Sequence, residues 1–230
     1  MTLSTVETCI PIPPCHQGED PVALIQEWMH RASELGYRGI VVDLTGWPMD
    51  GRFQACLQEA RAENITMDVF TRATIAVPDR SQVKRAFRNI RKKLGVDFIA
   101  LTSPDESTLN YAAKDTRIDI IHLGHLREFE AFTDGVASLA GQSGIFVELP
   151  FYMLLHVPSR HRSRILRGFN KVMHACASNH ARVLVSSWPR SPVDLKNAWQ
   201  KQVTLSELLD ASRQACRTIV VDNPRELVEP

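Results

Sequence analysis

Two stretches of this chain concentrate basic side chains in a way that could bind phosphate groups. Residues 80–96 contain seven Lys and Arg and no acid, and residues 149–193 also contain seven and no acid. The formal net charge of the chain is only +1, so its positive charge is segregated. Arginine predominates, and its planar guanidinium makes paired hydrogen bonds to phosphate oxygens. The candidate binding residues are Lys84, Arg85, Arg88, Arg91, Lys92, Arg160, Arg162, Arg164 and Arg167.

Folded RNA is the phosphate-rich partner that this pattern favours. Neutralising phosphates releases condensed counterions, so such binding would depend strongly on salt. The sequence has no stripe of aromatic residues of the kind that stacks unpaired bases, which favours recognition of backbone and shape. The alternative is a solvated surface whose counter-charges lie on neighbouring acidic helices. The sequence pattern alone leaves both interpretations open.

Carboxylate and imidazole side chains near the ends of expected strands suggest a second chemistry. A metal-dependent hydrolase would need several such ligands to converge, and the candidates are Asp43, His122, Glu148 and Asp222. His122 and His125 have the spacing of metal ligands on a helix, but they span a strand end and a loop. A polar strand terminus is the favoured interpretation. The chain also lacks glycine-rich phosphate loops and a nucleophile elbow, so we expect no catalytic residue, no metal and no cofactor.

These candidates must be positioned by alternating strands and helices. The stretch Val96–Ile121 shows the unit: an apolar strand, a helix start at Thr102–Asp105 and a second apolar strand. Continuously apolar strands are typical of a parallel sheet covered by helices. The same patterning predicts strands at 6–12, 37–44, 65–75, 96–101, 117–121, 144–149, 181–187 and 218–221. Helices are expected at 20–35, 53–60, 79–94, 105–113, 126–140 and 158–179, with two more pieces in 193–215.

Eight strands alternating with helices predict an α/β fold, a TIM-like (β/α) barrel formed by residues 1–230 as a single domain. Functional sites in such barrels lie at the carboxyl ends of the strands. The helices after the third and sixth strands are not neighbours around a barrel. The two basic stretches would therefore make separate contacts, one of which could be with a protein.

The location predicted from the sequence is cytoplasmic, without membrane association. No apolar run reaches the roughly 20 residues that a membrane span needs, and the N-terminus does not resemble a secretory signal. The five cysteines are odd in number and scattered, which fits a reducing compartment. Cys9 and Cys15 lie near His16, but no carboxylate is identified to orient a thiol–imidazole pair.

An ordered set of segments resembles one known family, that of archaeal ribonuclease P protein component 3. Its eukaryotic counterpart is a subunit shared by ribonucleases P and MRP. The matching segments lie in the family's order along nearly the whole chain. They are 32–40 (ASELGYRGI), 70–75 (FTRATI), 96–121 with its TSPD and DTRID motifs, 183–187 (VLVSS) and 192–195 (PVDL). The sequence departs from the family at Trp188-Pro189, where Gly-Ala is common.

The resemblance implies a barrel related to the polymerase-and-histidinol-phosphatase (PHP) metal hydrolases, without their metal centre. Cys9-Ile10-Pro11-Ile12 stands where those hydrolases have His-x-His, and Asp222-Asn223-Pro224 stands near the place of their Asp-x-His. It also implies that Arg72, Arg117 and Arg190 are basic family positions, which we add as candidate RNA contacts.

The function that the resemblance implies is that of a subunit of the ribonuclease P endoribonuclease. The catalytic RNA removes the 5′ leader of precursor tRNA, and this chain would support ribonuclease P RNA while pairing with protein component 2 and other holoenzyme proteins. Contact with precursor tRNA would be indirect. Two alternatives are a stand-alone PHP-type metal-dependent phosphoesterase and a barrel that only assembles proteins.

Overall fold

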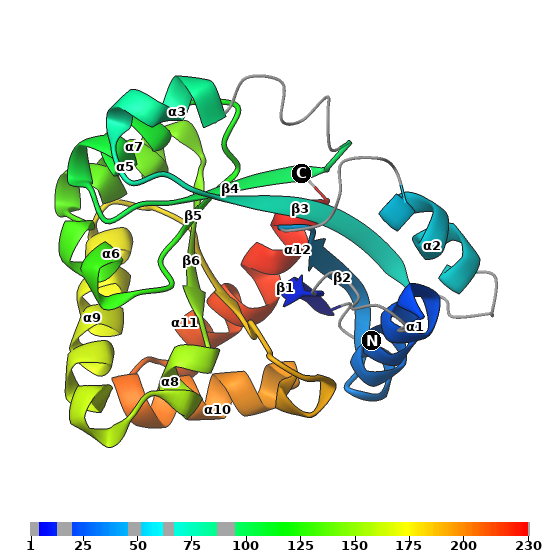
Figure 1. The fold of residues 1–230 in the computed structure, drawn as a ribbon. Coiled ribbons are helices and arrows are strands. Elements are labelled where there is room, and N and C mark those ends of the chain that lie inside the picture. The colour runs from blue at the N-terminus through cyan, green and yellow to red at the C-terminus, as the bar shows by residue number, and fades with distance from the viewer. Residues whose placement is uncertain (1–4, 13–19, 46–51, 62–66, 87–94, 230) are drawn as a thin grey trace.

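The computed structural model describes residues 5–12, 20–45, 52–61, 67–86 and 95–229. Seven parallel strands lie side by side in chain order, and they curve into a barrel that is nearly closed (Figure 1). The strands are β1 Thr5–Pro11, β2 Tyr37–Asp43, β3 Asp68–Ala76, β4 Phe98–Thr102, β5 Ile120–His122, β6 Phe146–Pro150 and β7 Val183–Ser186. The expected TIM-like α/β fold is confirmed.

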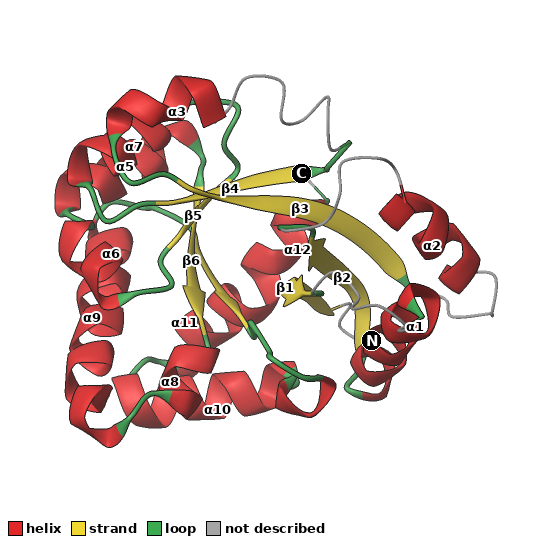
Figure 2. Ribbon diagram, viewed as in Figure 1, coloured by secondary structure: helices red, strands yellow, loops and turns green. Residues whose placement is uncertain are grey.

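Helices cover the outside of the strands (Figure 2). They are α1 Pro21–Glu34, α2 Arg52–Arg61, α3 Arg80–Ala86, α5 Glu106–Ala112, α6 Leu126–Ala131, α7 Asp134–Ser143, α8 Tyr152–His156, α9 Ser159–Ser178, α10 Ala198–Leu209, α11 Arg213–Arg217 and α12 Asn223–Val228. Two short helical segments are η1 Pro192–Asp194 and η2 Thr218–Asp222. Among the described residues, none of these helices is both long and apolar enough to cross a membrane.

The predicted strand at 218–221 is wrong, because this segment is the π-helical turn η2 between α11 and α12. A short run of apolar β-branched residues cannot by itself distinguish a strand from a buried helical segment. Ile219, Val220 and Val221 are buried, and the Asn223 amide donates a 2.7 Å hydrogen bond to the Val183 carbonyl oxygen. In the part of the chain that the structure describes, β1 and β7 form the two ends of the sheet. Helical segments therefore stand where an eighth strand was expected.

Two further expectations need adjustment. The helix predicted at 126–140 is two helices, because Phe132 has an extended backbone and the Thr133 hydroxyl accepts a hydrogen bond from the Val136 amide at the start of α7. The helix predicted at 79–94 is described only as far as Ala86. Arg88, Arg91 and Lys92 lie outside the described residues.

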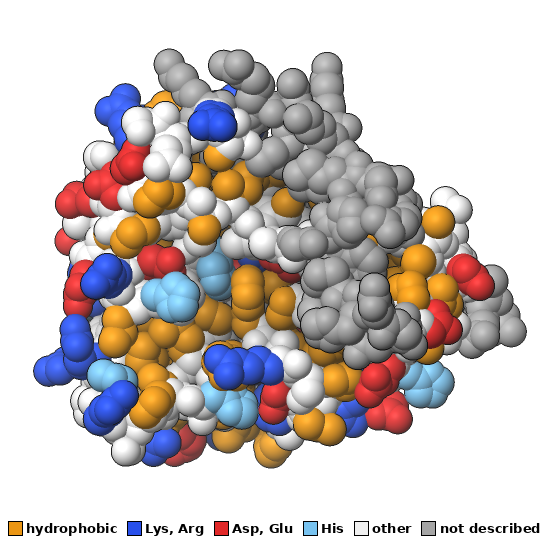
Figure 3. Space-filling model, in the orientation of Figure 1, with side chains coloured by type: hydrophobic (Ala, Val, Ile, Leu, Met, Phe, Trp, Pro, Cys, Tyr) orange, Lys and Arg blue, Asp and Glu red, His pale blue; other side chains and the backbone are white. Residues whose placement is uncertain are grey.

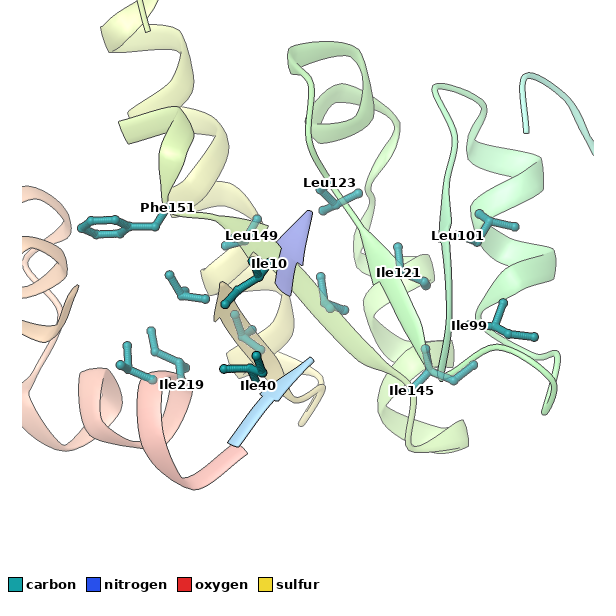
Figure 4. Packing of buried hydrophobic residues seen from close by; sticks show 14 of the residues in the cluster. Ile10, Ile40, Ile99, Leu101, Ile121, Leu123, Ile145, Leu149, Phe151 and Ile219 are labelled. Atoms are coloured by element: carbon teal, nitrogen blue, oxygen red, sulfur yellow. The ribbon is translucent and has the colours of Figure 1, made fainter. Parts of the chain in front are cut away.

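Strand alternation divides the buried side chains into two sets. One set points outward and packs under the helices; Figure 4 shows Ile99, Ile121 and Leu149 of this set together with Ile219 of η2. The other set points into the barrel. At the amino end of the strands this inner set is apolar and comprises Ala100, Ile120, Phe146, Leu184 and Leu227. Toward the carboxyl ends, the inner side chains become polar and charged.

Candidate nucleic-acid interface

Helix α9 is held against the barrel by one apolar face. Ile165, Phe169, Val172 and Cys176 are buried, at the three- and four-residue spacing of a helix face. The Phe169 ring meets the Phe129 ring of α6 edge-on at 5.5 Å. Gly168 permits this approach, because a Cβ atom there would lie 2.5 Å from Phe129. The opposite face of α9 is thereby fixed toward solvent.

The predicted arginines lie at exposed positions of α9, but not all on one face. Three of them lie opposite the apolar face, whereas Arg162 lies at its amino-terminal end, beside Leu155 and Ile165. Arg160, Arg162, Arg164 and Arg167 are all exposed. Arg164 forms a 3.0 Å ion pair with Glu130, whereas Arg160 donates a 3.1 Å hydrogen bond to the Nε2 atom of the adjacent His161. Within the described residues, neither Arg162 nor Arg167 forms an ion pair with a carboxylate. Helix α9 therefore carries more positive charge than the chain itself neutralises.

The position of these arginines opposes the stability of the helix. The amino end of a helix carries partial positive charge, so cations there are unfavourable and acids favourable. The first turn of α9 contains Arg160 and Arg162 and no acid, and no side chain caps it. Helix stability therefore does not explain this placement. An anionic partner would gain from both the arginine charges and the amino-terminal amide groups.

Lys171 lies further along α9, at the end of its charged face. Its ammonium group donates to the backbone carbonyl oxygens of Phe129 (3.0 Å) and Glu130 (3.2 Å) at the end of α6. Arg167 and Lys171 also line a shallow hollow of about 580 Å³ beside Asp134 and His174. The charged face thus runs from the start of α9 to the groove between α9 and α7.

The second basic stretch lies elsewhere on the barrel. α3 contacts α5, and α5 and α7 stand between α3 and α9 (Figure 1). Arg85 is exposed on α3, while the side chain of Lys84 lies outside the described part. The described part of the first stretch, α3, therefore lies apart from α9, in agreement with the barrel prediction.

The three arginines suggested by the family resemblance occupy three different environments. Arg190 is exposed, and its guanidinium lies 4.4 Å from the centre of the Tyr152 ring. Arg117 is half exposed and ion-paired with Asp115. Arg72 is fully buried inside the barrel. Arg72 is therefore corrected from a candidate RNA contact to an interior residue.

Inside the barrel, the Arg72 guanidinium contacts five acceptor atoms. Its two terminal nitrogens donate to the two carboxylate oxygens of Glu148 at 2.8 and 2.9 Å. They also donate to the Thr8 carbonyl oxygen (3.2 Å) and the Thr74 hydroxyl (2.9 Å). The Nε atom lies 3.2 Å from Asp43. A guanidinium thus stands between two of the carboxylates that a metal site would have needed.

Glu148 is the centre of this network. Besides Arg72, it contacts the His122 Nδ1 atom at 2.8 Å and the Trp188 Nε1 atom at 3.4 Å. Burial by itself would raise the pKa of the Glu148 carboxyl, but the Arg72 charge and the His122 contact outweigh it and hold the pKa well below its usual range. Glu148 is therefore an ionised partner of a fixed cation.

The donor set does not fit a metal ion. Asp222, the fourth candidate ligand, lies on η2 near Arg217 (3.6 Å), outside the Arg72 network. Among the described residues, no three His, Cys, Asp or Glu side chains are grouped so that they could hold a metal. Burial also raises the pKa of the Cys9 thiol, which keeps it protonated. Its candidate partners Cys15 and His16 lie outside the described residues.

A second buried ion pair was missed from the sequence. Lys201 of α10 donates to Glu7 of β1 at 3.0 Å, and the Ser187 amide and hydroxyl donate to the same carboxylate at 2.8 and 2.6 Å. Two signals could have indicated it. Lys201 shares the buried face of α10 with Leu205 and Leu209, and Glu7 is the one charged residue of a largely buried strand. The pair links β1 to the loop after β7, where the sheet is open.

Trp188, which departs from the family pattern, covers the charged network. Its ring stacks on His122 with centroids 4.5 Å apart. Its backbone φ is +46°, a left-handed conformation that costs a non-glycine residue about 1–2 kcal/mol. Stacking and the Glu148 contact must offset that cost. Glycine would adopt this backbone without strain.

Comparison with known proteins identifies one matching family and several solved structures with a similar fold. The family model described as RNase P subunit p30 matches residues 5–230. No curated protein matches the chain. A chain in the cryo-EM structure of archaeal ribonuclease P with mature tRNA is 17% identical, with a TM-score of 0.77 over 98% of this chain and 93% of that one.

Two hydrolases share the barrel at lower similarity. The adenine deaminase of Arthrobacter aurescens is 12% identical, with a TM-score of 0.55 over 91% of this chain and 80% of that one. The N-isopropylammelide isopropylaminohydrolase of Burkholderia multivorans is 11% identical, with a TM-score of 0.51 over 99% of this chain and 75% of that one. At such identities the likeness concerns the fold alone.

Proposed function

Because the chain belongs to the family of RNase P p30 subunits, we propose that it supports ribonuclease P RNA in removing the 5′ leader from precursor tRNA. The family match confirms the resemblance predicted from the sequence. In this proposal the chain binds RNA through its basic helices, pairs with protein component 2 and other holoenzyme proteins, and meets precursor tRNA only indirectly. It acts in the cytoplasm, as the sequence analysis expects.

The arginine face of α9 is the observation that carries the proposal. Arg160, Arg162 and Arg167 are exposed and lack an ion-paired carboxylate within the described residues, and two of them oppose the helix dipole. A solvated surface would be expected to show ion-paired counter-charges. Glu130 pairs with Arg164, while Glu130 and Asp134 line hollows beside Arg167 without forming an ion pair with it in the described structure. RNA phosphates are the counter-charge that this face lacks.

The chemical contribution of such a surface is electrostatic. Folding a large RNA brings phosphates together, and their repulsion is relieved by Mg²⁺ or by protein cations. Arginine forks fix the phosphates in one geometry in addition to neutralising them. A protein that lends positive charge in this way matters most when Mg²⁺ is scarce.

The chain itself supplies no catalytic centre in this account; the nuclease activity belongs to the holoenzyme. The stand-alone phosphoesterase is not favoured, because Arg72 engages both Glu148 and Asp43, and Asp222 lies elsewhere. A buried guanidinium with five acceptors cannot leave without exposing uncompensated charge.

The test is leader cleavage by a particle reconstituted from ribonuclease P RNA and its proteins. We expect reversal of Arg160, Arg162 and Arg167 to Glu to lower cleavage at low Mg²⁺ at least about tenfold, and high Mg²⁺ to restore it. The matched control reverses Arg213, Arg217 and Arg225, three exposed arginines on α11 and α12, and changes the net charge equally.

Two results would contradict the proposal. Equal loss in both triple variants would assign the effect to net charge, and unchanged cleavage in the α9 variant would remove α9 from the RNA contact. Component 2 should co-purify equally with both variants, since we propose that it docks on another face. A barrel that only assembles proteins would show no RNA crosslink to α9.

A further inference from the structure

We propose that the open end of the barrel holds a binding pocket for one unpaired nucleotide, separate from the α9 arginine face. A pocket of about 470 Å³ lies there, within the size range of small-molecule sites. Figure 3 shows histidine and hydrophobic side chains together near the centre of this face, over β5 and β6. The pocket is lined by Pro11, Thr74, Thr102, His122, His125, Tyr152, Met153, Trp188, Pro189 and Arg190, among others.

The composition of the pocket walls fits a nucleobase. Trp188, Tyr152 and His125 supply aromatic surface, and the prolines and Met153 supply apolar surface. Bases stack on aromatic side chains because every base has a π face. Thr74 and Thr102 add small polar residues to the lining.

The charge at the pocket rim fits a phosphate. Arg190 is exposed there and is placed over the Tyr152 ring, and it forms no ion pair with a carboxylate of the described residues. Glu128, the acid that lines the pocket, is buried and accepts hydrogen bonds from the Gly124 and His125 amide groups. The accessible charge is therefore positive, next to an aromatic wall.

The acid-free stretch of the sequence explains this combination. Pro150, Tyr152, Met153, Trp188, Pro189 and Arg190 all belong to residues 149–193, the stretch that also supplies the arginines of α9. The start of α9 follows β6 and α8, at the carboxyl end of the strands (Figure 1). An RNA strand on α9 could place one unpaired nucleotide in the pocket, and this RNA-borne version rests on the proposed function. A free mononucleotide presents the same chemistry.

The experiment uses the purified full chain, with radiolabelled AMP in equilibrium dialysis and a single-stranded adenylate hexamer in a filter-binding assay. Trp188→Gly removes the stacking surface at a position where the backbone suits glycine. We expect it to weaken AMP or hexamer binding at least about tenfold. Trp199→Ala, which removes an exposed tryptophan on α10, should leave binding unchanged.

A second variant keeps the test valid if Trp188→Gly fails to fold. Arg190→Gln should weaken AMP several-fold and leave adenosine unaffected, because adenosine has no phosphate. AMP binding that depends on Trp188 would identify a free nucleotide as a ligand. Hexamer binding alone that depends on Trp188 would identify a nucleotide within RNA.

The proposal is overturned if neither probe binds, or if both bind equally to the wild type and to a folded Trp188→Gly. Reversal of the α9 arginines should leave AMP binding intact. The experiments therefore distinguish an error in the proposed RNA function from an error in the proposed nucleotide pocket.

Discussion

Arginines inside the barrel and arginines on α9 have opposite surroundings. Arg72 has five acceptors and no exposed surface, and Lys201 is likewise buried against Glu7. Arg162 and Arg167 are exposed, without an ion-paired carboxylate in the described part of the chain. The interior cations are neutralised by the fold, whereas Arg162 and Arg167 have no ion-paired carboxylate among the described residues and, in our proposal, bind another molecule.

This difference separates two ways in which a barrel can use charge. A hydrolase barrel gathers carboxylates and histidines around a reactive ion. Here a guanidinium bridges Glu148 and Asp43, so the interior contributes to stability. The outer helix carries the charge that would act on RNA. Substitutions in the barrel interior and substitutions on α9 should therefore have different effects on stability and on RNA binding.

The largest effect is expected for Arg72→Met. This change leaves Glu148 and Asp43 buried without their cation, and breaking a buried ion pair costs about 3–5 kcal/mol. Chemical denaturation should show a loss of that size in the free energy of unfolding. Arg162→Met is the matched control, with a change within about 0.5 kcal/mol. A loss below about 1 kcal/mol for Arg72→Met would contradict the interior role.

A smaller loss is expected for Lys201→Met, about 2–3 kcal/mol. Glu7 would lose its cation but keep the two hydrogen bonds from Ser187. Adding Glu7→Gln to this variant should recover part of the loss, because the uncompensated charge is then removed. The measurement is the unfolding midpoint in urea. No recovery in the double variant would argue against a charge effect.

Acid should destabilise the protein through Glu148. The folded-state pKa of this carboxyl lies well below its ordinary value of 4.5, so its contribution is fully present above about pH 4.5 and declines as the pH falls below that value. Glu148→Gln should have a shallower loss of stability between pH 5 and about pH 3. Urea melts at several pH values would check this. Parallel curves for the two proteins would contradict the assignment.

The smallest change in stability is expected for a substitution on α9. Arg167→Gln should leave the free energy of unfolding within about 0.5 kcal/mol while lowering RNA affinity several-fold. Filter binding and urea melts on the same preparation measure both quantities. If Arg167→Gln lowers stability but leaves RNA affinity unchanged, Arg167 serves the fold and does not bind RNA.

Much of the fold follows from the sequence, because its strands are short runs rich in apolar residues and its helices have clear starts. Asp20 caps α1 where the sequence indicates, and the cap of α5 is Asp105, the last residue of the predicted helix start at Thr102–Asp105. The end of the chain could not be predicted in the same way. Thr218–Val221 has the composition of a strand, and only its packing in the gap between β7 and β1 makes it helical.

The candidate RNA-binding residues could likewise be predicted only in part. The exposure of Arg160, Arg164 and Arg167 could be predicted, because they fall outside the apolar face of a long amphipathic helix. Arg72 could not be recognised as buried, since its partners Glu148 and Asp43 come from strands far apart in the sequence. Sequence patterning reports faces of single elements, and an ion pair across a barrel depends on several of them together.

The most direct test is the salt dependence of RNA binding by the purified chain. Each arginine–phosphate contact contributes about 0.7–0.9 to the slope of log affinity against log salt concentration. Replacing Arg160, Arg162 and Arg167 with Gln should therefore make the slope shallower by about 2–3, while Gln at Arg213, Arg217 and Arg225 should not. If the α9 variant and the wild type have the same slope, the arginines of α9 do not neutralise RNA and the account is wrong.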